Sequence, residues 1–577
     1  MKKIINTIWL TKFWLPIIII FLLLINWLAA TFHTRIDFTN EKRFTLSAAT
    51  KKLIGELDVP VRIDVFLKGS FPSGFKKLSN SAAEILQEFK EIAGNKIQYN
   101  FIGPEDLVPN TNTTWGDTLI AMGLAPINIK AQIKSGEQQQ YAFPAAIVHY
   151  KENEIPVLLF EKKGITDKNV TGSITYSELN SAEALLEYKF ADAISKLSQV
   201  LRPMIAYSIG NGEPGDARSF DLAQDVLLKD YDLRTINLNK QLCNADTFKL
   251  LMIVKPIKSF TEEEKLKIDQ FVMRGGKLLM FVDKLEAELD SLQSMSNQVV
   301  AYDRNLEIND LLFKYGVRIN SDLVMDLQCD FLPFVTNGSD QMEYLHWNYF
   351  PLFESKSNHV INKNLSLVSS QFVNSIDTVE AEGIKKTILL SSSPNARTIA
   401  TPALISGNEN VNSPEDAKFK KANIPVAVLL EGKFQSLFSN RLSQAMIDTL
   451  AQYGTVFQPD CFANNKIIVV ADGDMVLNSV GKDGPLPMGV NRYTAGTQYA
   501  YQFANKDFLK NCLDYLINPS GLADAKSKDY SLRMLDTKKV NAQKGFWQLI
   551  NIAIPIILVM LLAILFQFVR KRKYTVA

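Results

Sequence analysis

The apolar positions of this chain form two long runs near its ends and shorter, periodic runs between them. Residues 13–32 and 546–569 contain no charged side chain. At 1.5 Å per helical residue, each run is long enough to cross the roughly 30 Å hydrocarbon layer of a membrane. Trp14, Trp27 and Trp547 lie near the ends of the runs, where amphipathic rings suit the membrane interface. The pattern predicts two transmembrane helices.

Removal of the first run as a signal peptide is the alternative. Lys2 and Lys3 precede the run and two small residues, Ala29 and Ala30, lie near its end, as in a cleavable signal. The apolar stretch exceeds the usual 7–15 residues of a signal peptide, however. We therefore expect the first helix to be retained.

Residues 33–200 alternate between strand and helix patterns. Residues 61–67 alternate inward and outward like a strand, residues 76–93 repeat apolar positions at helical spacing, and residues 96–102 form another strand. This order predicts a βαβ unit in an α/β domain. The remaining elements are a helix at 48–57 capped by Thr45 or Ser47, strands near 127–133, 145–150 and 156–160, and an amphipathic helix over 177–199.

Residues 201–517 show apolar strands separated by helices, which predicts a parallel, doubly wound sheet. Thr261 is placed to cap a helix with acidic residues in its first turn, and Gly275 is placed to end it. The predicted strands lie near 204–210, 233–238, 249–256, 277–283, 387–390, 426–430 and 466–471. The other predicted helices lie at 219–229 and 505–517.

An insertion near residues 331–421 interrupts this pattern. Residues 331–385 are aromatic-rich and indicate irregular structure, and residues 393–421 are polar and indicate a long loop. Aromatic side chains in 344–353 could line a carbohydrate or protein surface, but a buried satellite cluster is favoured. Residues 518–545 are polar and charged and predict a membrane-proximal connector.

The formal net charge of +2 conceals an uneven distribution. The 63 basic residues slightly outnumber the 61 acidic ones. Seven basic residues and no acidic ones lie in the tails 1–12 and 570–577, so acidic residues outnumber basic ones in the rest of the chain. The positive-inside rule places both tails in the cytoplasm and the body on the other side of the membrane. An acidic body argues against binding to nucleic acid, which needs a concentrated basic face.

The four cysteines are too few for a disulfide framework, and none forms a C-x-x-C pair. An oxidising compartment would still permit two disulfide bonds, whose pairing the sequence does not define. The spacing of histidines and cysteines does not suit zinc, and no G-x-x-x-x-G-K-[ST] phosphate loop exists. We therefore expect no metal and no cofactor.

Two strand ends carry residues that suit catalysis. Ser208 lies at a strand-to-turn transition, but the first glycine of a G-x-S-x-G elbow is missing. Asp472 and Asp474 resemble the D-x-D start of aspartyl phosphotransferases, but no Ser or Thr follows at the expected place. The structural alternative, in which these aspartates cap a turn or helix, is favoured.

The glycine-rich turn 210–215 contains Asn211 and Glu213. A turn before a helix N-terminus can bind an anion. The glycine spacing does not match the dinucleotide fingerprint, so a structural turn is favoured.

The order of several motifs along the chain resembles one family. They are RIDFTNEKRFTLS at 35–47, IAYSIGNGEPG at 205–215, YGVRINSDLVMDLQC at 315–329, IIVVADGDMVLN at 467–478 and NKDFLKNCLDYL at 505–516. Together they are similar to the gliding-motility-associated ABC transporter auxiliary, substrate-binding-like component, the GldG family. The resemblance covers nearly the whole chain.

The resemblance implies a class I glutamine amidotransferase-like fold for the second domain and a periplasmic body anchored in a bacterial inner membrane. It implies an ABC permease and an ATPase as partners. Formation of a homo-oligomer is a further alternative, which the sequence does not decide. An amidotransferase needs a cysteine nucleophile on a sharp turn, and the turns at Gly210 and Asp472 carry none. We therefore expect a non-catalytic subunit.

The competing hypothesis is a periplasmic hydrolase or a small-molecule-binding protein that uses the cleft of the α/β sheet. Its site would draw on residues at the carboxyl ends of strands, where open α/β sheets bind ligands. These candidates are Ser208, Asn211, Glu213, Asp472 and Asp474.

Overall fold

The computed structural model forms two compact units, residues 1–529 and 530–577. It describes residues 14–31, 45–69, 71, 73–124, 126–133, 136–160, 176–199, 201–289, 298–335, 342–354, 357–363, 365–407, 415–518, 521–527 and 537–574. Both short tails predicted to be cytoplasmic lie outside these residues, wholly for 1–12 and in part for 570–577. Most of the segment 35–47 also lies outside them.

The first domain is built on a four-stranded sheet in the order β2-β1-β5-β6. Strands β1 and β2 are parallel, and helix α4 connects them, so the predicted βαβ unit is present. Strand β5 runs antiparallel to β1 on its other side. The bounds are β1 Val61–Val65, α4 Ser73–Ala93, β2 Ile97–Phe101, β5 Ala145–Tyr150 and β6 Asn153–Leu158.

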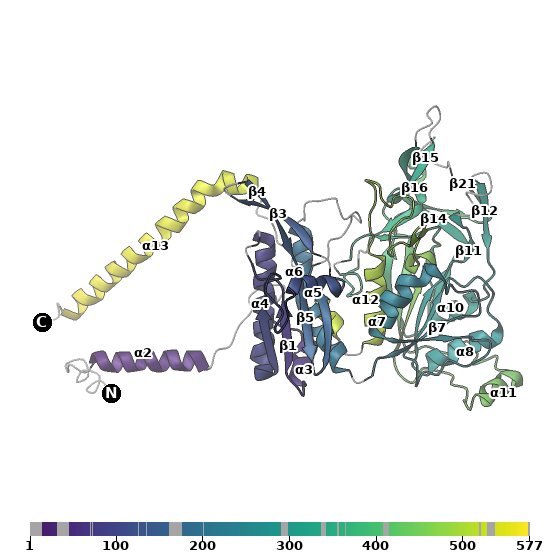
Figure 1. Ribbon diagram of the computed structural model, residues 1–577, viewed down its shortest axis with the longest axis horizontal. Coiled ribbons are helices and arrows are strands. Elements are labelled where there is room, and N and C mark those ends of the chain that lie inside the picture. Colours follow the sequence, from purple (N-terminus) through teal and green to yellow (C-terminus); the bar gives the residue numbers. More distant parts are fainter. Residues whose placement is uncertain are drawn as a thin grey trace. The chain divides into compact units, whose positions relative to one another are not determined.

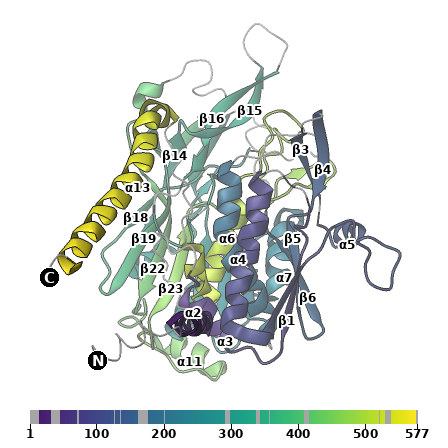
Figure 2. The same cartoon turned by 90° about the vertical axis from the view of Figure 1, so that its left-hand side faces the viewer.

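Two long helices cover the core of this domain. Helices α4 and α6 (Tyr176–Ser198) lie side by side (Figure 2), and their apolar faces join the buried residues of the sheet in one cluster. Helix α3 (Ala48–Gly55) begins at Ser47, whose hydroxyl accepts a hydrogen bond from the Thr50 amide at 3.1 Å. A hairpin follows α5 (Trp115–Ala121) and consists of β3 (Ile127–Ile133) and β4 (Gly136–Ala142).

The second domain contains a seven-stranded sheet in the order β19-β22-β23-β10-β9-β7-β8, of which Figure 2 labels β19, β22 and β23. The five strands from β23 to β8 are parallel, as predicted. The prediction of a purely parallel sheet is wrong at β22, which runs antiparallel to both of its neighbours, β19 and β23. The chain returns to the sheet in the opposite direction after β19, and mixed sheets of this kind are common. The bounds are β7 Met204–Ser208, β8 Asp232–Ile236, β9 Leu250–Val254, β10 Lys277–Phe281, β19 Ile384–Ser391, β22 Pro425–Gly432 and β23 Asn465–Val470.

Both faces of this sheet are buried. Successive residues of β10 point to opposite faces, so Leu278 belongs to one apolar cluster and Leu279 to another. Helices α8 (Glu262–Met273) and α10 (Asn309–Tyr315) contribute to the first cluster and α12 (Asn505–Ile517) to the second. Helix α8 begins at Thr261 in a capping box with Glu264, which matches the predicted start.

The regular helix predicted at 219–229 is wrong. The chain forms a 3-10 turn η2 (Ala217–Ser219), a π-helical segment η3 (Asp221–Leu227) and a single turn α7 (Leu228–Asp230). Contacts with a distant segment hold the start of η3: the Asp221 amide donates to Asn478 at 2.9 Å, and the Asp221 carboxylate accepts from the Met488 amide at 2.7 Å.

The insertion is also more regular than predicted. The aromatic stretch is a long strand, β16 (Met342–Phe353), which pairs with β15 (Cys329–Val335) in a projecting hairpin (Figure 1). Residues 347–353 are all buried, which removes the alternation that would have marked a strand. The predicted satellite cluster is confirmed around Trp347. The remaining strands are β11 Leu285–Glu286, β12 Gln298–Asp303, β13 Val317–Ile319, β14 Asp322–Asp326, β17 Val368–Ser369, β18 Ile376–Thr378, β20 Ala396–Ala400, β21 Ala403–Ser406, β24 Val480–Gly481 and β25 Gly484–Pro485.

The predicted polar connector contains a buried segment, η6 (Leu522–Ser527), that contacts both domains. Leu522 belongs to the apolar core of the first domain. Lys526 Nζ donates to Asn511 Oδ1 at 2.6 Å and to Asp514 Oδ2 at 3.1 Å, both on α12 of the second domain. Tyr188 of α6 donates its hydroxyl proton to the same Asp514 carboxylate. Segment η6 therefore lies where the two domains meet, at polar contacts between Lys526, Tyr188 and Asp514.

Helices are present at both predicted apolar runs. Helix α2 covers Trp14–Thr31, and α13 covers Thr537–Tyr574, so the second helix begins earlier than predicted. Within the part of the chain that the structure describes, one stretch is long and apolar enough to cross a membrane, Gln543–Arg572 in α13. None of its hydrophobic window is buried within the protein.

All four cysteines are described and all four are free thiols in buried positions. The protein therefore folds without a disulfide in this structure. Burial raises the pKa of the Cys461 thiol to about 11 and raises the pKa of each of the other three further.

Candidate functional site

The carboxyl ends of four neighbouring parallel strands carry polar side chains. Ser208 ends β7, Lys255 follows β9, Asp283 follows β10 and Asp472 follows β23. Strand β7 lies between β8 and β9, so the order of the strands reverses there. Ligands of open α/β sheets bind at the carboxyl ends of strands beside such a switch point.

Lys255 is the centre of a buried ion cluster, defined here as Lys255, Asp283, Glu288 and Asp474. Its ammonium lies 2.6 Å from Asp474, 3.1 Å from Glu288 and 3.5 Å from Asp283. The Lys255 side chain is only 4% exposed. Its amide donates to the Phe281 carbonyl at 2.8 Å, which fixes the loop after β9 against the end of β10.

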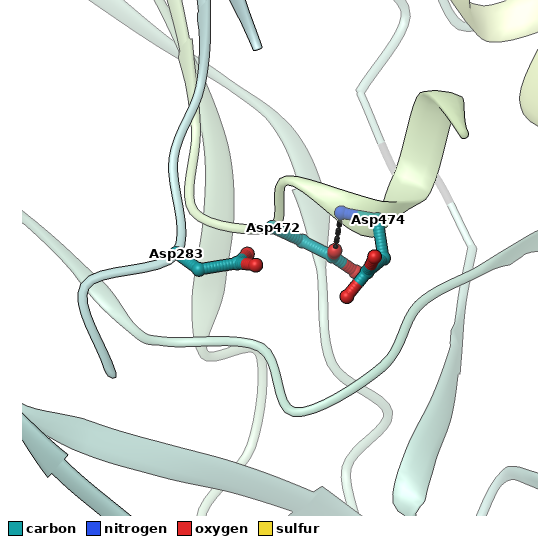
Figure 3. Close-up of side chains that lie close together, drawn as sticks. All are labelled: Asp283, Asp472 and Asp474. Atoms are coloured by element: carbon teal, nitrogen blue, oxygen red, sulfur yellow. Dashed lines mark hydrogen bonds between the residues drawn. The ribbon is translucent and has the colours of Figure 1, made fainter. Parts of the chain in front are cut away.

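Asp472 lies beside this cluster and caps a short helix (Figure 3). One carboxylate oxygen accepts from the amides of Asp474 at 2.7 Å and Met475 at 3.1 Å, at the start of η5 (Asp474–Val476). The other oxygen accepts from the Gln371 amide at 2.9 Å. This geometry supports the capping role of Asp472.

A glycine allows the close approach of these strand ends. The Gly473 amide donates to the Asp283 carboxylate. A Cβ atom added at Gly473 would lie 2.7 Å from the Lys255 Cβ atom, which is too close for a side chain.

Burial and the charges of the ion cluster shift the pKa values of Asp283, Asp472 and Lys255. Burial raises the pKa of Asp283 to about 6, against the opposing effect of Lys255. Burial and the neighbouring carboxylates Asp283 and Asp474 raise the pKa of Asp472 well above its ordinary value. Burial lowers the pKa of Lys255, but Asp474, Asp283 and Glu288 outweigh it, so the net shift is upward and Lys255 stays charged.

The carboxylates of Asp283, Asp472 and Asp474 offer oxygens within 4.8 Å of one another, a spacing that could hold a metal ion. The Lys255 ammonium already provides a positive charge in contact with two of them. Asp283 and Asp474 thus form an internal ion pair network with Lys255, whereas backbone amides hold Asp472.

A second group of predicted residues lies in the turn after β7. The Asn211 amide donates to Glu213 Oε2 at 2.8 Å, and Asn211 Nδ2 donates to Glu264 Oε2 at 3.4 Å. The Asn211 carbonyl accepts from the amides of Ile257 and Lys258, each at 2.8 Å, so the turn is joined to the loop after β9. Gly212 has φ of 89° and lies against Ile257, which explains a glycine there.

The five predicted site residues therefore form two groups. Asp472 and Asp474 belong with Lys255, whereas Ser208, Asn211 and Glu213 belong with Glu264. Ser208 is fully buried, and its hydroxyl has no hydrogen-bond partner, histidine included, in the described part of the chain. A serine hydrolase requires a base hydrogen-bonded to its nucleophile, and Ser208 has no such base among the described residues.

The sequence interpretation missed Lys255, Asp283 and Glu264. Lys255 follows β9 directly and Asp283 lies two residues beyond the end of β10, so their positions at the strand ends were a usable signal. No sequence signal indicated a site role for Glu264, because its T-x-x-E pattern with Thr261 indicates only a helix cap.

A cavity of about 170 Å³ lies over the ion cluster. Its lining includes Lys255 and Asp474 from the cluster, together with Arg218, Arg492 and Tyr493. The cavity thus exposes charges of both signs to a small polar ligand.

The fold and these sites define a mixed α/β protein with a buried structural ion network and an apolar C-terminal helix suited to membrane anchoring. Residues 202–512 match the family described as an ABC-type uncharacterized transport system. This match covers more than half of the chain, and the protein belongs to this family of transport-system auxiliary components. Residues 40–149 match a domain of unknown function.

An uncharacterized protein of Borreliella burgdorferi is 22% identical over 445 residues, which cover 74% of this chain and 78% of that protein. Two solved structures show weaker likeness. The mmIFT52 N-terminal domain is 14% identical with a TM-score of 0.30, over 55% of this chain and 97% of that domain. A putative ThuA-like protein from Parabacteroides merdae is 10% identical with a TM-score of 0.24, over 55% and 90% of the two chains.

Proposed function

We propose that this protein is a non-catalytic, two-pass membrane subunit of an ABC transporter complex. Membership of a transport-system auxiliary family is the observation that carries this proposal. The sequence contains no Walker phosphate loop, so ATP hydrolysis by that route belongs to a separate subunit. An ABC permease and an ATPase are the proposed partners.

Helices α2 and α13 are the proposed membrane spans. The described side chains of α2, those of residues 18–26, are exposed and apolar except for Asn26, and most of those in α13 are also exposed apolar groups. Such surfaces are stable in hydrocarbon and costly in water. With basic tails at both ends, the positive-inside rule places the termini in the cytoplasm and the body in the periplasm.

The buried segment η6 supports a role in coupling the body to the membrane. Only residues 528–536 separate η6 from α13. Because η6 contacts α12 through Lys526 and the first domain through Leu522, movement of this segment would act on both domains. We propose that ATP-driven motion of the partners reaches the body through this connection.

The resemblance to gliding-motility components supports a second part of the proposal, that the complex acts in gliding motility. In that case the complex would serve the surface movement of a bacterium with an outer membrane. A deletion strain would then lose gliding while the abundance of the permease and ATPase in the membrane stays unchanged.

Purification from native membranes tests the partner proposal. The full chain, tagged at its C-terminal tail and extracted in mild detergent, should recover an ABC ATPase and a permease in constant ratio. A tagged membrane protein of unrelated function, expressed at the same level, controls for carry-over. Recovery of neither subunit, with intact tagged protein, would overturn the proposal.

Binding of a small molecule is the second candidate function, and the cavity over the ion cluster favours it. Arg218 and Arg492 suit an anionic group, while Glu288 and Asp474 suit a cationic one. A screen of zwitterionic amino acids by thermal unfolding would test it. A ligand of this cavity should stabilise the wild-type chain and lose that effect in Arg218→Ala.

A further inference from the structure

Two buried carboxylates meet beside the turn after β7 without a basic partner. Glu213 is 9% exposed and Glu264 is 1% exposed. Each is hydrogen-bonded to Asn211, and their charges repel one another closely enough to raise the pKa of Glu213 further, burial being the larger cause. No lysine or arginine forms an ion pair with either glutamate within the described ranges. A buried charge without a partner is strongly unfavourable.

The unpaired atoms of this site are oxygens. Glu213 Oε1, Glu264 Oε1, Asn211 Oδ1 and Ser208 Oγ are all buried and have no hydrogen-bond partner among the residues that the structure describes. The second oxygen of each carboxylate is already used: Glu213 Oε2 accepts from the Asn211 amide, and Glu264 Oε2 accepts from the Thr261 amide at 2.8 Å. Burial raises the pKa of Glu213, and the Ser208 hydroxyl lies close enough to this carboxyl to oppose that effect. A cation in contact with these oxygens would be a partner for all of them.

We propose that Ser208, Asn211, Glu213 and Glu264 bind a hard divalent cation at the switch point of the sheet. The two carboxylates supply a charge of −2, which a divalent cation balances. The amide and hydroxyl oxygens complete an all-oxygen set, the donor type that Ca²⁺ and Mg²⁺ select and that thiolate-preferring metals do not.

Ca²⁺ is the better fit of the two. The four oxygens come from a turn, a strand end and the first turn of a helix, so a shell that they formed around an ion would be irregular. Ca²⁺ accepts irregular shells of six to eight oxygens, whereas Mg²⁺ demands near-ideal octahedral geometry. Water molecules would supply the remaining ligands.

The proposed role of the ion is to hold the turn 210–215 against the N-terminus of α8. Asn211 already joins these two segments through Glu264 and the Ser259 carbonyl. The ion would add a second connection across the switch point. This site is separate from the ion cluster around Lys255, which has its own internal positive charge.

The test measures binding of CaCl₂ and MgCl₂ to the full chain in detergent by calorimetry, after removal of metals with a chelator. We expect one Ca²⁺ per chain, weaker Mg²⁺ binding and an upward shift of the thermal unfolding midpoint with Ca²⁺. Glu213→Gln keeps the shape of the side chain and should weaken Ca²⁺ binding at least tenfold. Ser208→Ala should weaken it by a smaller factor.

Two control variants locate the site. Glu262→Gln removes an exposed carboxylate from the same first turn of α8 and should leave Ca²⁺ binding unchanged. Asp474→Asn alters the ion cluster and should also leave it unchanged. Loss of binding in Asp474→Asn with retention in Glu213→Gln would overturn the assignment.

A shared proton is the competing explanation for the two glutamates. In that case neither cation would bind or shift the unfolding midpoint at millimolar concentration, and folded Glu213→Gln would be at least as stable as the wild type. That combination would overturn the proposal. Circular dichroism of each variant confirms folding before the binding measurement.

Discussion

The Lys526 ammonium lies 3.1 Å from the Asp514 carboxylate, and both side chains are buried where the two domains meet. Lys526 also lies over the Tyr188 ring, 3.9 Å from its centroid. Burial raises the pKa of Asp514, but Lys526, Lys196 and the Tyr188 hydroxyl outweigh that effect, so the net shift is downward. The carboxylate therefore stays charged and holds the connector η6 to α12.

Replacing Lys526 by methionine should destabilise the full chain by about 3 kcal/mol, because it leaves the buried Asp514 carboxylate short of a partner. Denaturant unfolding in detergent measures the effect. Lys510→Met on α12, the helix that carries Asp514, is the control and should change stability by less than about 0.5 kcal/mol. Equal effects of the two substitutions would contradict a special role for Lys526.

The stability of the body should depend on pH through Asp283. Its pKa is about 6 in the folded chain and 3.8 in an unperturbed side chain, so the folded state binds the proton more tightly. The protonated Asp283 carboxyl therefore contributes about 3 kcal/mol to the free energy of unfolding below pH 4. This contribution is lost as the pH rises through 6. Asp283→Asn should abolish this component. Identical pH profiles of the two proteins between pH 4 and 7 would show that Asp283 does not titrate in this range.

Alanine at Gly473 should destabilise the fold by about 1–3 kcal/mol, because its Cβ atom would meet the Lys255 side chain. The backbone of Gly473 has φ of −78°, so conformational strain is not the cause. Gly215→Ala, with no atom within 4 Å of the added Cβ, is the control and should be nearly neutral. Thermal unfolding of both variants separates the two cases.

The four thiols should resist modification in the native protein. All are buried, and burial raises their pKa values, so little reactive thiolate forms at neutral pH. A thiol reagent should label the native chain slowly and four positions after denaturation. Rapid labelling of a native thiol would mean that the surrounding core opens readily.

Local signals predicted much of the fold. The Thr261 cap, the helix 505–517 and the βαβ unit of the first domain follow from patterns a few residues long, and the structure contains all three. The direction of β22 depends instead on the path of the preceding insertion, which no local pattern specifies. The aromatic strand β16 was missed because burial on both faces removed its alternation.

The candidate site was predictable only in part. Asp472 and Asp474 stand out because they follow an apolar strand, but the capping role of Asp472 depends on the distant Gln371 amide. Lys255 and Asp474 are 219 positions apart in sequence and become partners only through the pairing of β9, β10 and β23. Such partners follow from sheet topology, which a single sequence does not specify.

Photo-crosslinking from α13 in living cells tests the central claim most directly, that this chain is a membrane subunit of an ABC transporter. Photoreactive residues would replace Leu558 and Leu562, which are exposed on α13, and Leu404 on β21 would serve as the control position outside the helix. The account predicts crosslinks from α13 to an ABC permease and none to it from Leu404. Crosslinks from α13 to lipid alone, with the permease present in the same membrane, would contradict the account.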